Sequence, residues 1–350
     1  MQREIAARRR EIVSGLFPEG IPSLWCPMIM HYKQDGRMDL KRMESHLQFM
    51  LPDVHSFLLF GSTGDGWELD RQEKEALLQT YVGWAKQYGV RMLLGVLQPG
   101  IGETYRELGR WVEWLKAYAH TEDAAQAMQA CGVVGFTVCA PKGAELSQDT
   151  IRAELKKILE LGLPTAIYQL PQVTENEIAP ETLSFLAGEY PNFYLFKDTS
   201  GADHALLSGL DFHGVFFVRG MEGGYYGWYA GDGARYPGFL LSSANCFASL
   251  LREMMRAAEN GDAALAKDLS GKVEEMIGDM FANAGDLTGG NVFANANKCL
   301  EHCLAYGAKW DQAPMPMRHC GDAIPRPYVA FAAQTLIRFG FMRETGYLKG

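Results

Sequence analysis

Lys197 is the residue of this chain with the clearest capacity for covalent chemistry. It ends the apolar run 193–196 and is followed by Asp198 and a Thr-Ser-Gly segment. Such a run is typical of a buried strand, and burial disfavours the charged form of a lysine amine. A neutral amine can attack a carbonyl carbon and form a Schiff base. The alternative is that Lys197 only extends to solvent or pairs with a carboxylate such as that of Asp198.

Two other polar segments also follow short apolar runs. The sequence Gly-Ser-Thr-Gly-Asp at 61–65 follows the run 57–60, and Tyr-Gln-Leu-Pro at 168–171 follows 164–167. In a parallel (β/α) barrel, the residues that carry the chemistry lie at the carboxyl ends of the strands. We therefore expect Lys197 and both segments to meet at one mouth of a barrel.

The rest of the chain supplies the elements of such a barrel. Short apolar runs alternate with helical patterns, which favours a parallel sheet. Eight strands are predicted, near 22–29, 56–61, 91–96, 134–140, 164–168, 193–197, 215–219 and 237–243. They predict an α/β fold, a (β/α)8 TIM barrel, which needs roughly 250 residues. We expect an N-terminal arm at 1–18 (a short amphipathic helix or a mobile segment), the barrel at 19–258 and a C-terminal helical domain at 259–350.

Composition limits the classes of function. Of the 350 residues, 47% are hydrophobic, so the chain can bury a large core. The net charge of −9 and the lack of a long basic run argue against a nucleic-acid partner. Seven cysteines, an odd number spread through strands and helices, favour reduced thiols in a cytoplasmic protein. No stretch is long and apolar enough to span a membrane, so no membrane partner is expected.

The polar segments resemble the motifs of a known family. Residues 61–65, 168–171 and 196–201 are similar, in this order, to the GTTGE, YNxP and KDxSG motifs of the dihydrodipicolinate synthase / N-acetylneuraminate lyase superfamily. The likeness runs from about Gly20 to about Gly307. Each motif alone is weak, but three in order at strand ends are specific. The resemblance implies a Schiff-base aldolase built on a TIM barrel with a C-terminal helical domain, and a homo-oligomer, a dimer or a tetramer.

The resemblance also implies a role for each motif residue. Lys197 would form the imine, and Tyr168 would pass protons beside it. Ser62 and Thr63, in the turn that begins at Gly61, would bind the substrate carboxylate, and the backbone N–H groups of such a turn can form an anion nest. The alternatives are a glycine turn that serves geometry alone and a core tyrosine whose hydroxyl is satisfied locally.

Two departures from the family pattern bear on the substrate. Dihydrodipicolinate synthases carry an arginine two residues after the motif proline, where this chain has Val173, and an aliphatic side chain cannot supply a bidentate fork. The chain is therefore expected not to be a true dihydrodipicolinate synthase. Residues 141–143, Pro-Lys-Gly, replace family aromatics, one of which reaches into a neighbouring subunit's site. Without that aromatic, the intersubunit tyrosine relay is absent or another group replaces it.

Two further polar residues match sugar-acid lyases of the family. Glu222 lies in the loop after the seventh predicted strand, and Ser242 lies at the end of the eighth. Both could bind hydroxyl groups of a substrate tail, although Ser242 could equally cap a helix. Residues 101–132 look like an insertion relative to the family and are predicted to form an extended barrel helix with a surface excursion, not a dedicated binding element.

No metal or cofactor is predicted. Cys299, His302 and Cys303 fall at helical spacing, but two thiolates and one imidazole lack a fourth ligand, so a half-buried helix face is the better interpretation. Schiff-base chemistry needs no cofactor, because the lysine imine is itself the electron sink.

The sequence thus predicts a carbon–carbon lyase, a Schiff-base aldolase. It would act on pyruvate plus an aldehyde, or on a hydroxylated 2-keto sugar acid. One alternative is a dehydratase that uses the same imine to expel a hydroxyl group from a 2-keto sugar acid. Another is a catalytically impaired protein that binds 2-keto acids, which the altered segment 141–143 would explain.

Overall fold

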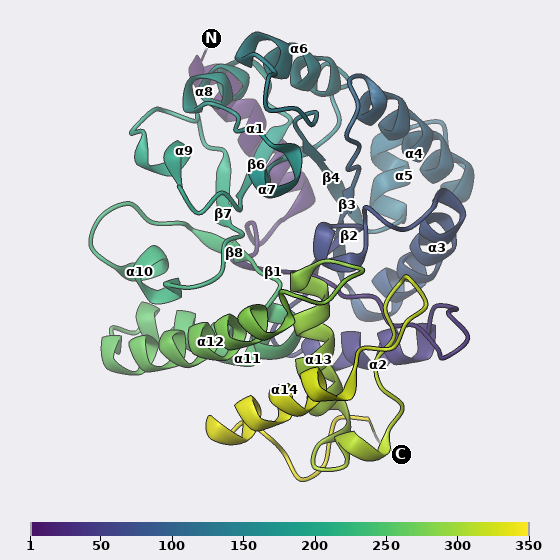
Figure 1. Cartoon of the computed structure of the whole chain (residues 1–350). Coiled ribbons are helices and arrows are strands. Elements are labelled where there is room, and N and C mark those ends of the chain that lie inside the picture. The colour runs from purple at the N-terminus through teal and green to yellow at the C-terminus, as the bar shows by residue number, and fades with distance from the viewer. Residues whose placement is uncertain (1, 349–350) are drawn as a thin grey trace.

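The computed structural model describes residues 2–348 and contains a closed barrel of parallel strands (Figure 1). The strands are β1 (Leu24–Pro27), β2 (Ser56–Leu59), β3 (Arg91–Gly95), β4 (Val133–Cys139), β5 (Thr165–Gln169), β6 (Phe193–Asp198), β7 (Phe216–Arg219) and β8 (Gly238–Leu240). Each strand pairs with the next in sequence, and β8 closes the barrel on β1. The predicted (β/α)8 barrel is confirmed, and each predicted strand overlaps an observed one.

Helices surround the barrel and continue beyond it. They are α1 (Gln2–Leu16), α2 (Leu40–Met50), α3 (Arg71–Tyr88), α4 (Glu103–Ala119), α5 (Ala124–Ala130), α6 (Gln148–Leu159), α7 (Pro171–Thr174), α8 (Pro180–Glu189), α9 (His204–Leu207), α10 (Tyr225–Ala230), α11 (Ala244–Glu259), α12 (Ala263–Ala284), α13 (Val292–Tyr306) and α14 (Arg326–Arg338), with 3₁₀ turns η1 (Ser62–Gly64) and η2 (Trp310–Gln312). The segment 101–132 forms α4 and α5, an extended barrel helix and a short companion. No helix in the described part of the chain is both long and apolar enough to cross a membrane.

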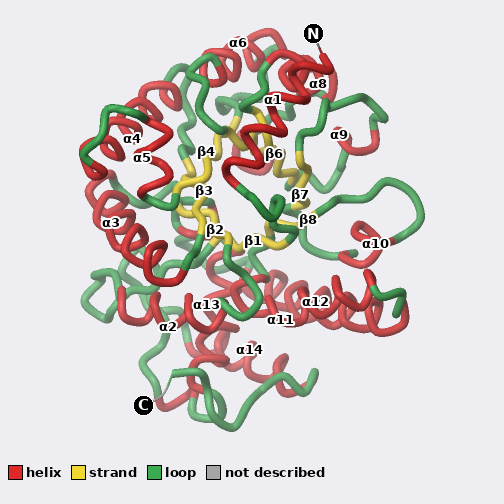
Figure 2. The backbone as a smooth tube through the Cα atoms, turned by 180° about the vertical axis from the view of Figure 1, so that it is seen from behind, coloured by secondary structure: helices red, strands yellow, loops and turns green. Residues whose placement is uncertain are grey.

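The N-terminal segment closes one end of the barrel. Figure 2 shows α1 lying across the barrel opening on the side opposite to the view of Figure 1. The buried Arg9 guanidinium donates to the carbonyl oxygen of Phe193, the first residue of β6, at 2.7 Å. Phe17 packs against Trp25 and Tyr194 in the barrel interior. Of the two predicted states of this arm, the packed helix is the one observed, and it blocks the amino-terminal ends of the strands.

The C-terminal helices pack beside the barrel. Helix α11 follows β8 directly, and α12, α13 and α14 lie next to it in the lower part of Figure 1. Asp262 caps α12 by accepting a hydrogen bond from the N–H of Leu265, which explains the break after α11. The domain boundary at 258 and 259 falls at the end of α11 and remains a prediction. Helix α13 also contacts η1 at the barrel mouth, so this region reaches the candidate site.

Candidate active site

Lys197 and Tyr168 meet at the open mouth of the barrel. They are register partners on the adjacent strands β6 and β5. The Lys197 Nζ atom lies 3.9 Å from the centroid of the Tyr168 ring. Both side chains are buried, at 4% and 3% exposure. Burial lowers the pKa of Lys197 to about 7, so a large fraction of the amine is neutral near pH 7.

The alternative role for Lys197, pairing with Asp198, is not observed. The Asp198 carboxylate accepts hydrogen bonds from the backbone N–H of Ser200, at 2.9 Å, and from its hydroxyl, at 2.6 Å. Among the ion pairs of the described residues, none includes Lys197. The amine is therefore available to a carbonyl substrate.

The Tyr168 hydroxyl stays protonated and can act as a proton donor. Burial raises the pKa of Tyr168 well above its usual value, and the nearby hydroxyls of Thr199 and Ser62 oppose part of that rise. The buried Thr199 Oγ1 atom has no hydrogen-bond partner within residues 2–348. A protonated phenol beside a neutral amine is the arrangement that general acid catalysis at a forming or breaking imine requires.

The predicted carboxylate-binding turn is a rigid 3₁₀ turn, η1, whose Ser62 and Thr63 are both buried. The Ser62 hydroxyl accepts a hydrogen bond from Trp67 Nε1 at 2.9 Å, and Asn291 from the C-terminal region donates to the Ser62 carbonyl at 2.6 Å. A Cβ atom at Gly61 would lie 2.8 Å from the side chain of Leu58. A side chain at this position would therefore displace that of Leu58, which is itself buried in the barrel.

A buried ion pair supports the same turn. Lys298 Nζ of α13 lies 3.0 Å from Asp65 Oδ2, and both side chains are 2% exposed. Tyr32 donates a hydrogen bond to the same carboxylate oxygen at 2.9 Å. Asp65 follows η1 with φ of 52°, a left-handed conformation that its partners hold in place. The family likeness, which runs to about Gly307, includes Lys298 but did not indicate its role.

Replacing Lys298 with methionine is expected to weaken substrate binding. The variant leaves the Asp65 carboxylate buried without a cationic partner, which typically costs about 3–5 kcal/mol of stability. We expect KM for pyruvate to rise by roughly tenfold with a smaller change in kcat, because η1 shifts while Lys197 stays. Steady-state kinetics of Lys298→Met and of the double variant Asp65→Asn/Lys298→Met measure this. Stability should partly return in the double variant; an unchanged KM in a folded Lys298→Met protein would contradict the role.

Glu222 and Ser242 contact each other. The Glu222 carboxylate accepts hydrogen bonds from the hydroxyl of Ser242 at 2.7 Å and from the hydroxyl of Tyr225 at 2.7 Å. Ser243 adds its backbone N–H at 2.9 Å and its hydroxyl at 2.6 Å. The structure therefore brings both predicted residues together at the ends of β7 and β8. Hydrogen bonds from other residues of the protein occupy the acceptor positions of the Glu222 carboxylate.

Gly220 is a site residue that sequence reasoning missed. A Cβ atom at this position would lie 2.7 Å from Cε of Lys197 and 2.2 Å from Oγ1 of Thr199. Gly220 follows β7 directly, and its N–H donates to the carbonyl of Asp198 at 2.6 Å. The absence of a side chain at the end of β7 therefore makes room for the lysine.

Replacing Gly220 with alanine is expected to displace Lys197 and to slow its reaction with pyruvate by roughly 10²-fold. Gly227→Ala is the matched control, because a Cβ atom at Gly227, in α10, meets nothing within 4 Å. The rate of borohydride trapping with pyruvate, measured for both variants, checks this. Equal trapping rates in the two variants would show that position 220 does not position the amine.

The segment 141–143 is anchored inside the chain. Asn176 Nδ2 donates to the carbonyl oxygens of Pro141, at 2.8 Å, and Gly143, at 2.9 Å. Lys142 pairs with Glu175 at 3.0 Å. This loop therefore offers no aromatic side chain to a neighbouring site. The hydroxyls of Thr199 and Ser62 lie beside Tyr168, and the Trp67 indole donates a hydrogen bond to that of Ser62.

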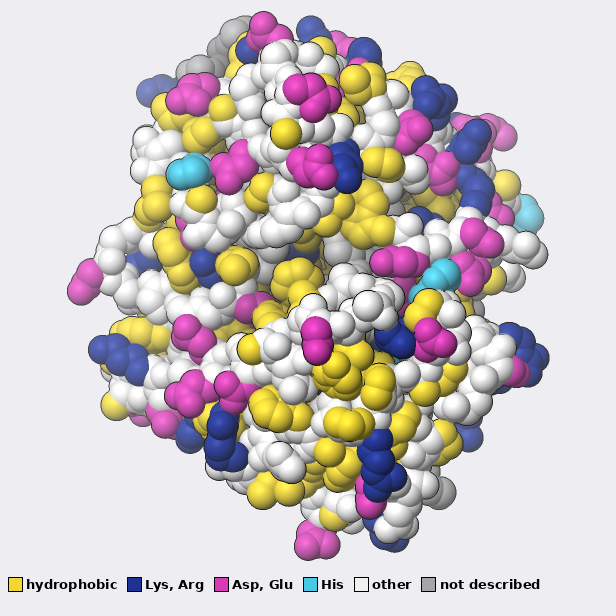
Figure 3. Space-filling model, in the orientation of Figure 1, with side chains coloured by type: hydrophobic (Ala, Val, Ile, Leu, Met, Phe, Trp, Pro, Cys, Tyr) yellow, Lys and Arg dark blue, Asp and Glu magenta, His cyan; other side chains and the backbone are white. Residues whose placement is uncertain are grey.

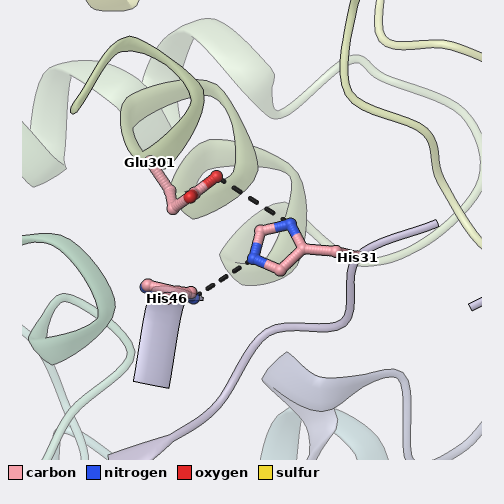
Figure 4. Close-up of side chains that lie close together, drawn as sticks. All are labelled: His31, His46 and Glu301. Atoms are coloured by element: carbon pink, nitrogen blue, oxygen red, sulfur yellow. Dashed lines mark hydrogen bonds and ion pairs between the residues drawn. The ribbon is translucent and has the colours of Figure 1, made fainter. Parts of the chain in front are cut away.

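A second polar cluster consists of His31, His46 and Glu301 (Figure 4). His31 Nε2 lies 3.2 Å from His46 Nδ1, whereas His31 Nδ1 faces Glu301 Oε2 at 3.8 Å. Arg42 Nη2 donates to both carboxylate oxygens of Glu301, at 2.8 and 2.9 Å. Burial and Arg42 act in opposite directions on the pKa of Glu301, and the net shift is downward. The cluster is a buried polar network in which Arg42 already occupies both oxygens of Glu301.

The three α13 residues considered as metal ligands have separate surroundings. His302 Nε2 lies 2.8 Å from the Trp310 carbonyl oxygen, and Cys303 Sγ lies 3.6 Å from the Val329 carbonyl oxygen. Burial raises the pKa of Cys299 to about 12, which disfavours the thiolate that a metal would need. These contacts favour the interpretation of a packed helix face.

Comparisons with known proteins find relatives in the family that the sequence motifs resemble. The model of the dihydrodipicolinate synthetase family matches residues 117–289. A 4-hydroxy-tetrahydrodipicolinate synthase of Streptomyces coelicolor is 25% identical over 73% of this chain and 78% of its own. A protein described as a probable 2-dehydro-3-deoxy-D-pentonate aldolase of Escherichia coli K12 is 25% identical over 75% of this chain and 80% of its own.

A solved structure shares the fold. It is a prophage protein of E. coli K12 from the dihydrodipicolinic acid synthase family, in complex with pyruvate. Its TM-score to this chain is 0.66 at 16% identity, and the match covers 91% of this chain and 98% of the other. The family match, the ordered motifs and the lysine at the end of β6 together support a relationship of this chain to the dihydrodipicolinate synthase / N-acetylneuraminate lyase superfamily.

Proposed function

We propose that this protein is a Schiff-base aldolase that joins pyruvate to an aldehyde, or cleaves the corresponding 4-hydroxy-2-keto acid. The observation that carries the proposal is the buried, unpaired amine of Lys197 beside the Tyr168 phenol. Relatives named as synthases and as an aldolase of keto sugar acids support the same reaction class.

The proposed reaction uses each site residue in turn. The carboxylate of the keto acid binds at Ser62 and Thr63, in the turn that begins at Gly61. The neutral Lys197 amine attacks C2 of the keto acid. The Tyr168 phenol donates a proton to the resulting hydroxyl group, which leaves as water, and an iminium forms. Loss of a proton from C3 then gives an enamine, whose C3 can attack an aldehyde carbon.

True dihydrodipicolinate synthase activity is not proposed. Val173 occupies the position of the arginine that such enzymes need, according to the family resemblance, and it packs among apolar side chains. The dehydratase alternative stays open, because expulsion of a hydroxyl group would use the same imine and the same phenol. The impaired binding protein is disfavoured, because the described site carries both an amine and a proton donor.

Borohydride trapping tests the proposal. Pyruvate and sodium borohydride are added to the protein, and the digested peptides are weighed. We expect the mass increase of one reduced pyruvate adduct on the peptide that contains Lys197. An increase on another peptide, or none, would contradict the proposal. Release of an aldehyde, as opposed to water, from a 4-hydroxy-2-keto acid then separates an aldolase from a dehydratase.

A further inference from the structure

The side chains packed around Tyr168 are apolar. Four buried residues form the centre of this cluster and two partly buried ones pack against it: Leu97, Cys139, Tyr168 and Leu170, then Trp67 and Val173. We call these six residues the Tyr168 wall. They come from the carboxyl-terminal ends of β3, β4 and β5, from α7 and from the segment after η1. Figure 3, which views the mouth as Figure 1 does, shows hydrophobic side chains near the centre of that face.

Two cations near the mouth are already paired. Arg219 at the end of β7 forms a buried pair with Asp203 at 3.0 Å. Lys142, after β4, pairs with Glu175 at 3.0 Å on the rim. The wall itself carries no ionised side chain at neutral pH, because burial raises the pKa of Cys139 to about 12 and raises that of Tyr168. A charged substituent placed against it would lose hydration without gaining a partner.

The Glu222 carboxylate, on the polar side of the mouth, has little capacity to accept further hydrogen bonds. Glu222 accepts four hydrogen bonds from Tyr225, Ser242 and Ser243. A carboxylate has about four lone-pair sites. A substrate hydroxyl could bind Glu222 only by displacing one of these donors. The wall and the saturated carboxylate therefore disfavour a sugar-like tail for the same reason: neither offers it new hydrogen bonds.

We propose that the aldehyde partner carries an uncharged hydrocarbon substituent, aliphatic or aromatic. This inference rests on the proposed function. In that reaction the Tyr168 phenol protonates the oxygen on C4, the former aldehyde carbon, so the substituent of C4 lies against the Tyr168 wall. In condensation, C3 of the enamine attacks the aldehyde carbon, the C3–C4 bond forms, and the phenol protonates the new alkoxide. The proton that C3 lost on forming the enamine restores the phenol after it has protonated the departing water, and the proton released on hydrolysis of the imine restores it after it has protonated the alkoxide. Hydrolysis of the imine releases a 4-hydroxy-2-keto acid, with no net oxidation.

Aldehydes of similar length and different polarity test the substrate class. The full chain is incubated with pyruvate and either butanal, glyceraldehyde or succinic semialdehyde, and consumption of pyruvate is followed. We expect kcat/KM for butanal to exceed that for each of the others by about tenfold or more. A preference for glyceraldehyde or succinic semialdehyde overturns the inference, and so does a lack of condensation with all three aldehydes. Borohydride trapping with pyruvate alone, run in parallel, reports separately on the proposed function.

Position 173 gives a second test within the wall. Val173→Arg should shift the ratio of kcat/KM for succinic semialdehyde over butanal upward by about tenfold or more, because a guanidinium can hold the added carboxylate. Val173→Leu is the matched control and should keep the preference for butanal. The ratio within one variant does not depend on how much of it is folded. An unchanged ratio in Val173→Arg means that the substituent lies elsewhere, and the inference fails.

Discussion

Replacing Lys197 with methionine is expected to abolish imine formation with pyruvate and to stabilise the fold. Methionine keeps the length and apolar stem of lysine but lacks the nucleophile, so turnover should fall by roughly 10⁴-fold or more. Borohydride trapping followed by peptide mass analysis measures the first effect. Retention of an adduct in Lys197→Met would assign the imine to another lysine.

The pH dependence of trapping in the wild type gives an independent measure of the same amine. Burial lowers the pKa of Lys197 to about 7, so the reactive neutral form should increase as the pH rises through 7. We expect the trapping rate to increase from pH 6 to pH 8 with a midpoint near 7. A midpoint above pH 9 would place the reacting lysine in a solvated position.

The stability effect follows from proton linkage. Between pH 7 and 10.5 the unfolded chain binds a proton at Lys197 that the folded chain has released, so wild-type stability rises with pH across this window. Methionine removes this dependence. Lys197→Met should therefore be more stable near pH 8, by roughly 1–4 kcal/mol, and the difference should shrink toward pH 10.5. Thermal unfolding of both proteins at pH 8 and at pH 10 checks the sign.

Much of the architecture could be predicted because it depends on local patterns. The eight strands are short apolar runs that end at polar residues, and the barrel places all such ends at one mouth. Asp70 followed three residues later by Glu73 is a capping-box pattern, and the two residues form that box at the start of α3; Gly89 ends the helix in a left-handed conformation. These signals lie within a few residues of one another, so the sequence displays them directly.

The parts that could not be predicted depend on contacts between distant residues. Asp65 and Lys298 are 233 positions apart, and no spacing rule connects them. Gly220 reads as an ordinary loop glycine until its neighbours Lys197 and Thr199 are known. Glu222 could be named as a polar group at a strand end, but its saturation by Tyr225, Ser242 and Ser243 is a property of the folded mouth.

Replacing Tyr168 with phenylalanine is expected to slow turnover by about 10²–10⁴-fold while leaving the imine trappable. The change deletes only the hydroxyl that donates the proton, and the ring keeps its place in the wall and beside the Lys197 amine. The pKa of Lys197 should stay low, since burial is its main cause. Turnover with pyruvate and an accepted aldehyde measures the loss of catalysis, and trapping by borohydride measures imine formation.

Tyr194→Phe is the matched control for this prediction. Tyr194 is also a buried barrel tyrosine, but it lies on β6 toward the closed end, where its hydroxyl donates to the Val134 carbonyl at 3.1 Å. Loss of that bond should cost about 1 kcal/mol of stability and leave turnover near the wild-type value. Near wild-type turnover in Tyr168→Phe would remove the phenol from the mechanism. If both variants lost turnover equally, the effect would come from the barrel core, because only Tyr168 lies within reach of the amine that carries the substrate.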